Sequence, residues 1–281
     1  MLLGLASGKV GDLVFYRDGG EQRTRTRVVP KNPRTPAQQR QRCKIANVSA
    51  VYRQLSAVLS SAFTSAKPNQ SGYNVFAASA IPLAPYLTKE MASAGACLPQ
   101  PCLMSKGVLP SLPYVGYFRG DQGFGLEVPS SISASTATIG ALSAALIANY
   151  SQVQQGDKVT YVSLRYTPSS DESLDFDLFD IIPSVTSFVV DTESAETIAA
   201  AGFDVLDSTL TTNEMITISE GGVGMGAVIL SRVDEGGVLQ VSTQRAELSP
   251  SASTLYDEYR TAEAANAAIE SYMAGSESVL R

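Results

Sequence analysis

Closely spaced carboxylates are the first groups in this sequence that could serve as acids, bases or metal ligands. Asp171, Glu172, Asp175, Asp177 and Asp180 lie close together, and strand alternation would place Asp175 and Asp177 on one face. General acid–base pairs and Ca²⁺ sites both use this residue type. The stretch lacks the central glycine and the terminal glutamate of an EF-hand loop. We therefore interpret Asp171, Glu172, Asp175 and Asp177 as a solvated loop or as an acidic acceptor surface for a basic partner.

Histidine is absent from the chain. This excludes Ser-His-Asp and Cys-His catalysis and His-ligated metal sites. The three cysteines, Cys43, Cys97 and Cys102, are too few for a disulfide scaffold and, without histidine, for a tetrahedral zinc site. Cys97 and Cys102 lie close enough in sequence to pair, but buried free thiols are the expected state.

Residues 221–226, GGVGMG, are the one glycine-rich stretch that resembles a phosphate-binding loop. They open a predicted strand rather than a helix, so a phosphate would meet no helix N-terminus. A turn or bulge that enters a hairpin explains these glycines better. The sequence therefore predicts no catalytic residue, no cofactor-binding residue, no metal ligand and no cofactor, and it predicts a protein that is not an enzyme.

Charge is divided unevenly along the chain. Residues 1–53 carry eleven Lys or Arg against three Asp or Glu, a net charge of +8, whereas the remaining residues carry ten against 24, a net charge of −14. A basic arm on an acidic body can bind the acidic body of a neighbouring copy or nucleic acid, or it can stay a solvated surface. We favour the neighbouring copy, because a body of −14 would repel a polyanion.

Residues 12–29 are typical of a β-hairpin whose turn is Asp18-Gly19-Gly20. Alternation places Arg23, Arg25 and Arg27 on one face of the return strand. A two-stranded hairpin is only marginally stable alone, so this one must dock on its own body or on another subunit.

A long helix is predicted from Ala37 to about Ser65, with Thr35 as its N-cap and Pro36 at its first position. Its first turns are polar all round, which indicates that they project beyond the core or meet a partner. The predicted assembly interface combines the hairpin with this helix start: Arg23, Arg25, Arg27, Arg34, Gln38, Gln39, Arg40 and Arg42.

The rest of the chain predicts an α+β, β-rich fold: a β-sandwich body, Ig-like or similar, with an N-terminal hairpin arm, one long N-terminal helix and a C-terminal helix. Residues 73–115 are expected to be largely irregular because they are rich in proline. The predicted divisions are an arm (residues 1–35), the long helix with the irregular segment (36–112), the sandwich (113–248) and the C-terminal helix with a tail (249–281).

The N-terminal sequence is the most distinctive part of the chain. Gly8-Lys9-Val10-Gly11 is followed by Asn32-Pro33-Arg34-Thr35 and, two residues later, Gln38-Gln39. This pattern resembles an uncharacterised domain family of Bacteroidetes and their phages, which opens with a Gly-Lys-x-Gly hairpin, Asn-Pro-Arg-Thr-x-x-Gln-Gln and a long helix. Shorter stretches are similar too: residues 73–76, 105–109, 228–232 and 242–244. The resemblance implies a phage virion or surface-assembly component with an Ig-like or sandwich body and no catalytic residues.

We therefore expect a non-enzymatic structural protein of a bacteriophage virion, assembled in the host cytoplasm, that self-associates or docks on other virion proteins. The alternatives are a nucleic-acid-binding packaging or internal protein that uses the same arginines and an adhesin-like binding module. A homo-oligomer is expected, nucleic acid is the less favoured partner, and no membrane partner is expected because no segment reaches about 20 apolar residues.

Overall fold

The structure, a computed structural model, describes residues 7–18, 21–28, 34–64, 70–113, 124–132, 137–169, 178–207, 213–218 and 224–274. Helices and strands are mixed and the sheets are antiparallel, so the predicted α+β class is confirmed. The helices are α1 (Pro36–Leu59), α2 (Gly72–Ala80), the short 3₁₀ helix η1 (Ile81–Leu83), α3 (Lys89–Ser93), α4 (Ile139–Asn149), α5 (Pro250–Glu258) and α6 (Ala262–Ala274). In the part of the chain that is described, no helix is long and apolar enough to cross a membrane.

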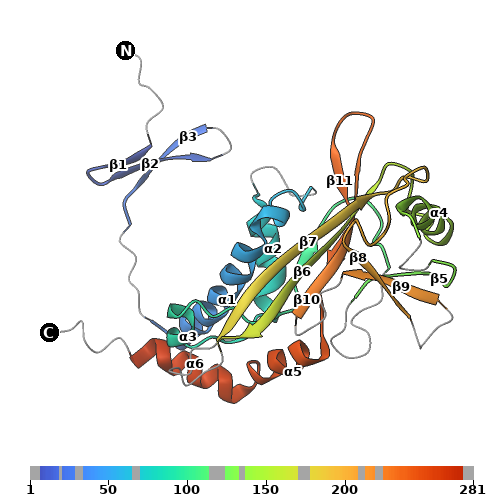
Figure 1. The fold of residues 1–281 in the computed structure, drawn as a ribbon. Coiled ribbons are helices and arrows are strands. Elements are labelled where there is room, and N and C mark those ends of the chain that lie inside the picture. Colours follow the sequence, from blue (N-terminus) through green and yellow to red (C-terminus); the bar gives the residue numbers. More distant parts are fainter. Residues whose placement is uncertain are drawn as a thin grey trace, which may run out of the picture.

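The strands form one long sheet, two smaller ones and a separate N-terminal sheet (Figure 1). The long sheet has the order β11-β10-β6-β7, and β13 also pairs with β10. Its strands are β6 (Lys158–Pro168), β7 (Phe179–Val189), β10 (Gly224–Val233), β11 (Leu239–Val241) and β13 (Glu247–Leu248). The smaller sheets are β5-β9-β8, from β5 (Leu126–Pro129), β8 (Phe203–Asp207) and β9 (Asn213–Ile218), and β12-β4, from β4 (Leu103–Ser105) and β12 (Gln244–Arg245).

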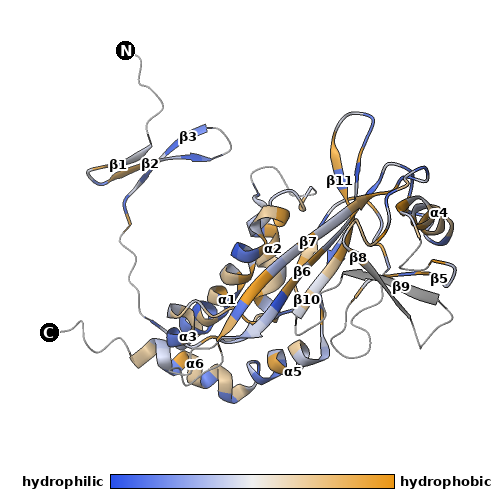
Figure 2. Cartoon of the chain, in the orientation of Figure 1, coloured by the Kyte–Doolittle hydropathy of each residue, from blue (hydrophilic) through white to orange (hydrophobic). Residues whose placement is uncertain are grey.

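The central strands are buried on both faces, so both sets of alternating side chains are apolar. On β6, Val162 and Leu164 point to one face, whereas Val159 and Tyr161 point to the other. Each face therefore forms its own core. Figure 2 shows stretches of hydrophobic colour on β6 and β7, and it shows mainly hydrophilic colour on β3.

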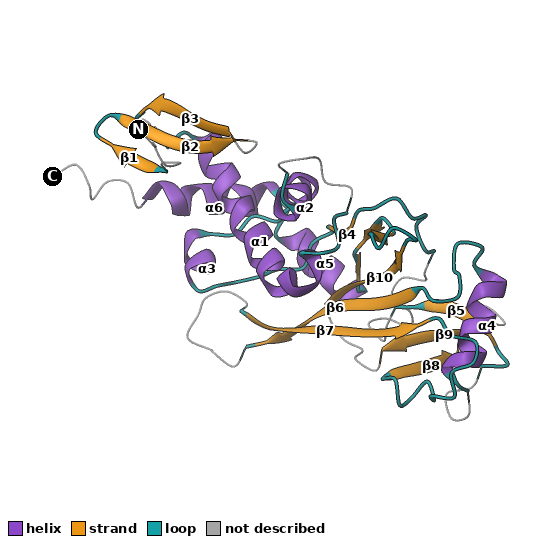
Figure 3. Cartoon of the chain, turned by 90° about the horizontal axis from the view of Figure 1, so that it is seen from above, coloured by secondary structure: helices purple, strands orange, loops and turns teal. Residues whose placement is uncertain are grey.

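Helices α1 and α2 cover the first face of the long sheet. Val48, Val51, Leu55 and Leu59 of α1 recur at helical spacing and are buried there. The second face packs against α4 and the β5-β9-β8 sheet, which meet it through residues such as Leu142. Figure 3 shows α1 and α2 toward one end of β6 and β7, and α4 with β5, β8 and β9 toward the other.

Helix starts follow their capping signals, whereas helix lengths differ from the prediction. The Thr35 hydroxyl accepts a hydrogen bond from the Gln38 backbone N–H at 3.4 Å, and the Ser249 hydroxyl caps α5 in the same way. The first helix ends at Leu59, before the predicted end near Ser65. The predicted C-terminal helix is two helices, because the chain turns at residues 259–261 and Thr261 caps a new start.

The prediction of a largely irregular segment at residues 73–115 is wrong at its start, where α2 forms. The Ser71 hydroxyl accepts from the Asn74 N–H at 3.2 Å, and Val75, Phe76 and Ala80 are buried against α1. In the central sheet, β7 is a long strand that runs from Phe179 to Val189.

The N-terminal segment forms a three-stranded sheet rather than the predicted two-stranded hairpin. It contains β1 (Gly8–Val10), β2 (Leu13–Asp18) and β3 (Glu21–Thr26) in the order β1-β2-β3, and we call it the arm sheet. Gly11 and Asp12 join β1 to β2, and Gly11 has a φ of 59°, a value that glycine adopts readily. Figure 1 shows the arm sheet clear of the helices and of the long sheet.

Candidate assembly interface

The arm sheet has two chemically different faces. Pairing sets Val10 opposite Leu13, Thr24 opposite Phe15 and Gln22 opposite Arg17, so these side chains share one face; we call it the apolar face for Val10, Leu13 and Phe15. Tyr16 pairs with Arg23 and Val14 with Arg25, so these residues share the other face, the arginine face. The predicted alternation of arginine and threonine along β3 is therefore confirmed for Arg23 and Arg25.

Charged groups of the arginine face already contact one another. An Arg23 guanidinium nitrogen lies 3.3 Å from Asp18 Oδ2 and another lies 3.9 Å from Glu21 Oε2. The Arg25 guanidinium lies 5.6 Å from the centre of the Tyr16 ring, which is cation–π distance. All of these side chains are exposed, so each contact is weak and is screened by salt. Arg27 is exposed as well, and its backbone N–H donates to the Asp12 carbonyl at 2.6 Å.

The apolar face is uncovered by the described residues. Val10 is 68% exposed and Leu13 45% exposed, while Phe15 is half-buried. No residue of the arm sheet is fully buried. Burying an apolar side chain of this size contributes about 1.5–3 kcal/mol, so the exposed face stores a driving force for association.

The predicted interface residues at the start of α1 differ in their exposure to solvent. Gln38, Arg40 and Arg42 are exposed, and Arg34, just before the N-cap, is half-buried with a φ of 50°. Gln39 is fully buried, so it cannot contact a partner. Its Oε1 accepts from Arg42 Nη1 at 3.2 Å, and its Nε2 has no hydrogen-bond partner among the described residues.

Helix α6 explains why the first turns of α1 do not project from the molecule. It packs along α1, and Tyr272 of α6 lies near Arg42 and Cys43, the latter fully buried. The expectation that these turns extend beyond the core is therefore wrong for the face that carries Gln39 and Cys43. The predicted acidic acceptor residues, Asp171, Glu172, Asp175 and Asp177, lie outside the described residues.

The cysteines form no candidate reactive site. All three are free and buried, which confirms the expected thiols and gives no Cys97–Cys102 disulfide. Burial raises the pKa of Cys43 to about 11 and the pKa values of Cys97 and Cys102 to about 12. Thiols in this state are poor nucleophiles at neutral pH. Among the described residues no cluster of acidic or cysteine side chains could hold a metal ion.

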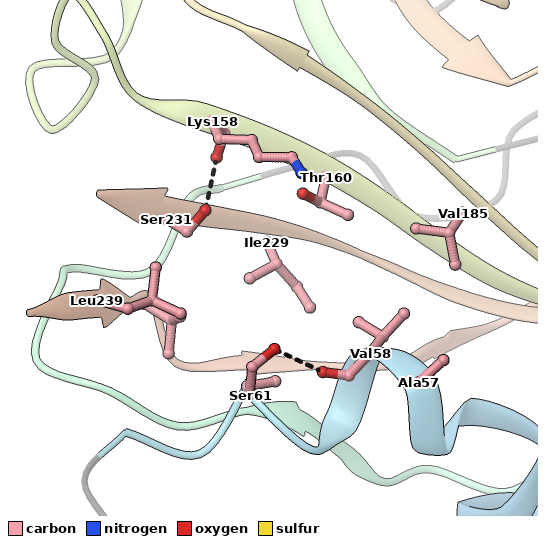
Figure 4. Close-up of a pocket in the computed structure, with 11 residues that line it drawn as sticks. Ala57, Val58, Ser61, Lys158, Thr160, Val185, Ile229, Ser231 and Leu239 are labelled. Carbon is pink, nitrogen blue, oxygen red and sulfur yellow. Dashed lines mark hydrogen bonds between the residues drawn. The ribbon is translucent and has the colours of Figure 1, made fainter. Parts of the chain in front are cut away.

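In the described part of the chain, β7 borders an apolar pocket and a second cavity. The first, the apolar pocket, has a volume of about 280 Å³ and lies between the end of α1 and strands β6, β7, β10 and β11 (Figure 4). Val58, Val185, Ile229 and Leu239 give it an apolar lining, with the Lys158 ammonium group at its edge. Two hydroxyls there are already donors to backbone carbonyls: Ser231 to Lys158 and Ser61 to Val58.

The second cavity, the acidic hollow, has a volume of about 520 Å³. It is lined by Ile139 and Phe188, which belong to the second core, and by the acidic residues Asp191 and Glu196. Asp191 Oδ1 accepts hydrogen bonds from Gln155 Nε2 at 2.9 Å and from the Glu193 N–H at 3.1 Å. Hydroxyl groups lie beside charged side chains in both cavities: Ser194 with Asp191 and Glu196 in the acidic hollow, and Ser231 with Lys158 in the apolar pocket.

Sequence reasoning missed two parts of this interface: the strand β1 and the apolar face that β1 helps to form. The signal was present, because Val10 and Leu13 flank Gly11-Asp12, a pair suited to a two-residue turn. No family model, no curated protein and no solved structure matches the chain.

Proposed function

We propose that this chain is a non-enzymatic structural protein that assembles with copies of itself through its arm sheet and the exposed start of α1. The single observation that carries the proposal is the uncovered arm sheet, whose apolar side chains Val10 and Leu13 face solvent beside a basic face. A small sheet without a covering layer gains stability only when a partner covers it.

Charge supports the choice of partner. The first 53 residues carry +8 and the remainder −14, so the arm of one copy complements the body of another. Many weak contacts of this kind suffice when symmetry repeats them. The resemblance of the N-terminal motif extends the proposal to a bacteriophage particle, with an Ig-like or similar sandwich body and other virion proteins as further partners.

The test is the mass in solution of two chains, the full chain and a variant that begins at Arg34 and so keeps the Thr35 cap. Light scattering on a gel-filtration column should give a multiple of 29.7 kDa for the full chain and a single copy for the variant. The same mass for both chains, whether monomer or oligomer, would refute assembly through the arm.

Nucleic acid remains the competing partner, because Arg40 and Arg42 are exposed beside the arm. Binding to duplex DNA would weaken steeply with salt, with a log–log slope of about −0.9 per phosphate neutralised. We expect no binding of the full chain to duplex DNA at 50 mM salt by fluorescence anisotropy. A steep salt dependence that is lost with the arm would favour the packaging function instead.

A further inference from the structure

The outer edge of β7 is an open position in the long sheet. β7 pairs with β6 from Phe179 to Val189, and no described strand pairs with its other edge. An edge strand presents unpaired N–H and C=O groups to any extended segment that approaches it. Pro183 has no N–H to donate, so the uninterrupted part of this edge is residues 184–189.

Two side chains along this edge are both apolar and exposed. Val185 is 51% exposed and Val189 is 52% exposed, although both lie in a strand of the central sheet. They pair with Val162 and Lys158 of β6, so both point to the face that carries the apolar pocket. Proteins usually protect a long edge with lysine, a bulge or a covering segment, and among the described residues the edge of β7 has only Pro183 for this purpose.

Charge singles out the same edge. Between Arg165 and Arg232 the sequence contains twelve Asp or Glu and no Lys or Arg. This stretch includes all of β7, and it supplies Asp191 and Glu196 of the acidic hollow. Asp191 and Glu196 therefore give a cationic strand an electrostatic attraction to the C-terminal end of β7.

The arm sheet provides a strand with matching properties. β3 has six residues, is exposed throughout, and pairs only with β2 among the described strands. Its alternation of arginine and threonine suits a pleated strand that meets acidic groups on one face. Its length equals that of the uninterrupted edge at residues 184–189.

We propose that β3 of one copy pairs with residues 184–189 of β7 in a second copy, so that the arm sheet extends the long sheet of its neighbour. This inference rests on the proposed function and names its acceptor. Strand addition of this kind takes affinity from backbone hydrogen bonds and specificity from side chains on the two faces.

The two faces of the extended sheet match. On the apolar face, β3 would bring Thr24 and Thr26 beside Val185 and the apolar pocket, with Leu13 and Phe15 of β2 one strand further out. The arginine face, with Arg23 and Arg25, continues the opposite face, where the acidic hollow lies beside the second core. A reversed orientation would place arginines over the apolar pocket and its Lys158, so charge and hydrophobicity select one orientation.

The experiment changes the edge in the full chain. The variant Val185→Lys/Val189→Lys places two cations where the cationic strand would pair, and it should lower the mass in solution to that of one copy. The control is Val233→Lys/Val238→Lys, which makes the same change at valines that are 64% and 60% exposed at the β10–β11 hairpin. The control should keep the wild-type mass, and equal melting temperatures should show that both variants are folded.

Hydrogen exchange gives a second measurement that needs no substitution. Peptides that cover residues 184–189 should exchange at least tenfold more slowly in the full-chain oligomer than in the variant that begins at Arg34. Peptides from β10 should exchange equally in both proteins, because β10 is paired within the chain.

The possible results separate the two proposals. If the arm-deleted variant is monomeric while the β7 variant keeps the wild-type mass and exchange is unchanged, the arm docks elsewhere and this inference is overturned, but the proposed function stands. If the full chain is itself monomeric, both proposals fail. An arm that closes on its own β7 would give that monomer together with protection of residues 184–189.

Discussion

Asp157 and Arg232 form the most buried ion pair in the described part of the chain. The Asp157 side chain is 1% exposed, and its two oxygens accept from Arg232 Nε at 2.6 Å and Nη2 at 2.7 Å. Asp157 also accepts from the Gln154 N–H, and Arg232 donates to the Gln152 carbonyl, so the pair ties the loop before β6 to the end of β10. The carboxylate raises the pKa of Arg232 above its usual value.

The variant Asp157→Asn should lose about 3 kcal/mol of folding free energy, because an amide would remove the counter-charge of Arg232 from a site that is only 1% exposed. Urea denaturation measures this loss. Glu270→Gln, at an exposed position of α6, makes the same chemical change and should cost less than about 0.5 kcal/mol. Equal stability of the two variants would mean that the pair contributes nothing.

The buried thiols make the free energy of unfolding depend on pH, and the direction of this dependence follows from their pKa values. Their pKa values in the folded chain, about 11 for Cys43 and about 12 for Cys97 and Cys102, exceed the ordinary value of 9.0. The folded state therefore holds these protons more tightly than the unfolded state. The stabilisation is complete below pH 9 and is lost as the pH rises from 9 toward 12.

We accordingly expect Ellman's reagent to react with none of the three thiols in the native protein at pH 8 within minutes, and with all three in 8 M urea. The free energy of unfolding, followed by urea titration, should fall between pH 9 and pH 11. Rapid reaction of a native thiol at pH 8 would contradict the burial of that cysteine.

At the scale of elements, side-chain packing explains why position 226 in the glycine-rich stretch is a glycine. Gly226 lies in β10, and a Cβ atom there would stand 2.1 Å from Cε1 of the Phe124 ring. That ring packs in the second core, 6.0 Å from the Tyr161 ring between centroids. Close packing thus requires this glycine, which agrees with the interpretation against a phosphate loop.

The variant Gly226→Ala should therefore lose about 2 kcal/mol of stability in urea denaturation, because the ring must move. The double variant Gly226→Ala/Phe124→Leu relieves the contact. Its loss of stability should therefore be about 1 kcal/mol smaller than the sum of the two single losses. Strictly additive losses would show that the ring and the glycine do not meet.

Local signals predicted those elements whose boundaries depend on neighbouring residues. Thr35-Pro36 predicted the start of α1, because capping involves residues only three positions apart, and Ser249 caps α5 in the same way. Helix α2 was missed because its residues are mostly small and lie between proline-rich stretches, and its stability comes from packing on α1.

The sequence distance between contacting residues also decides which parts of the candidate interface could be predicted. The faces of β3 follow from strand alternation and were predictable, whereas Gln39 is buried on α1, against which α6 packs from more than two hundred residues later in the sequence. The open edge of β7 depends on sheet order, which no local pattern specifies. Contacts between residues far apart in the sequence therefore determine both that Gln39 is removed from the interface and that the edge of β7 is open as the proposed acceptor.

At the scale of the whole molecule, the separation of the arm sheet from both cores has a thermodynamic consequence. Neither core contains a residue before Val48, and the third buried cluster contains none before Ala46. A chain that begins at Arg34 keeps every one of these residues and the Thr35 cap. Its body should therefore fold with almost the same free energy as the body of the full chain.

We expect the urea midpoints of the two chains to correspond to within about 0.5 kcal/mol, when both are measured at a concentration where the full chain is a monomer. At concentrations where the full chain assembles, its midpoint should rise with protein concentration, and that of the shortened chain should stay constant. A loss of more than about 2 kcal/mol on shortening at the low concentration would mean that the arm packs on its own body. Association through the arm would then have to break intramolecular contacts first. Burial of the apolar face would no longer favour association, because that face would already be buried in the monomer.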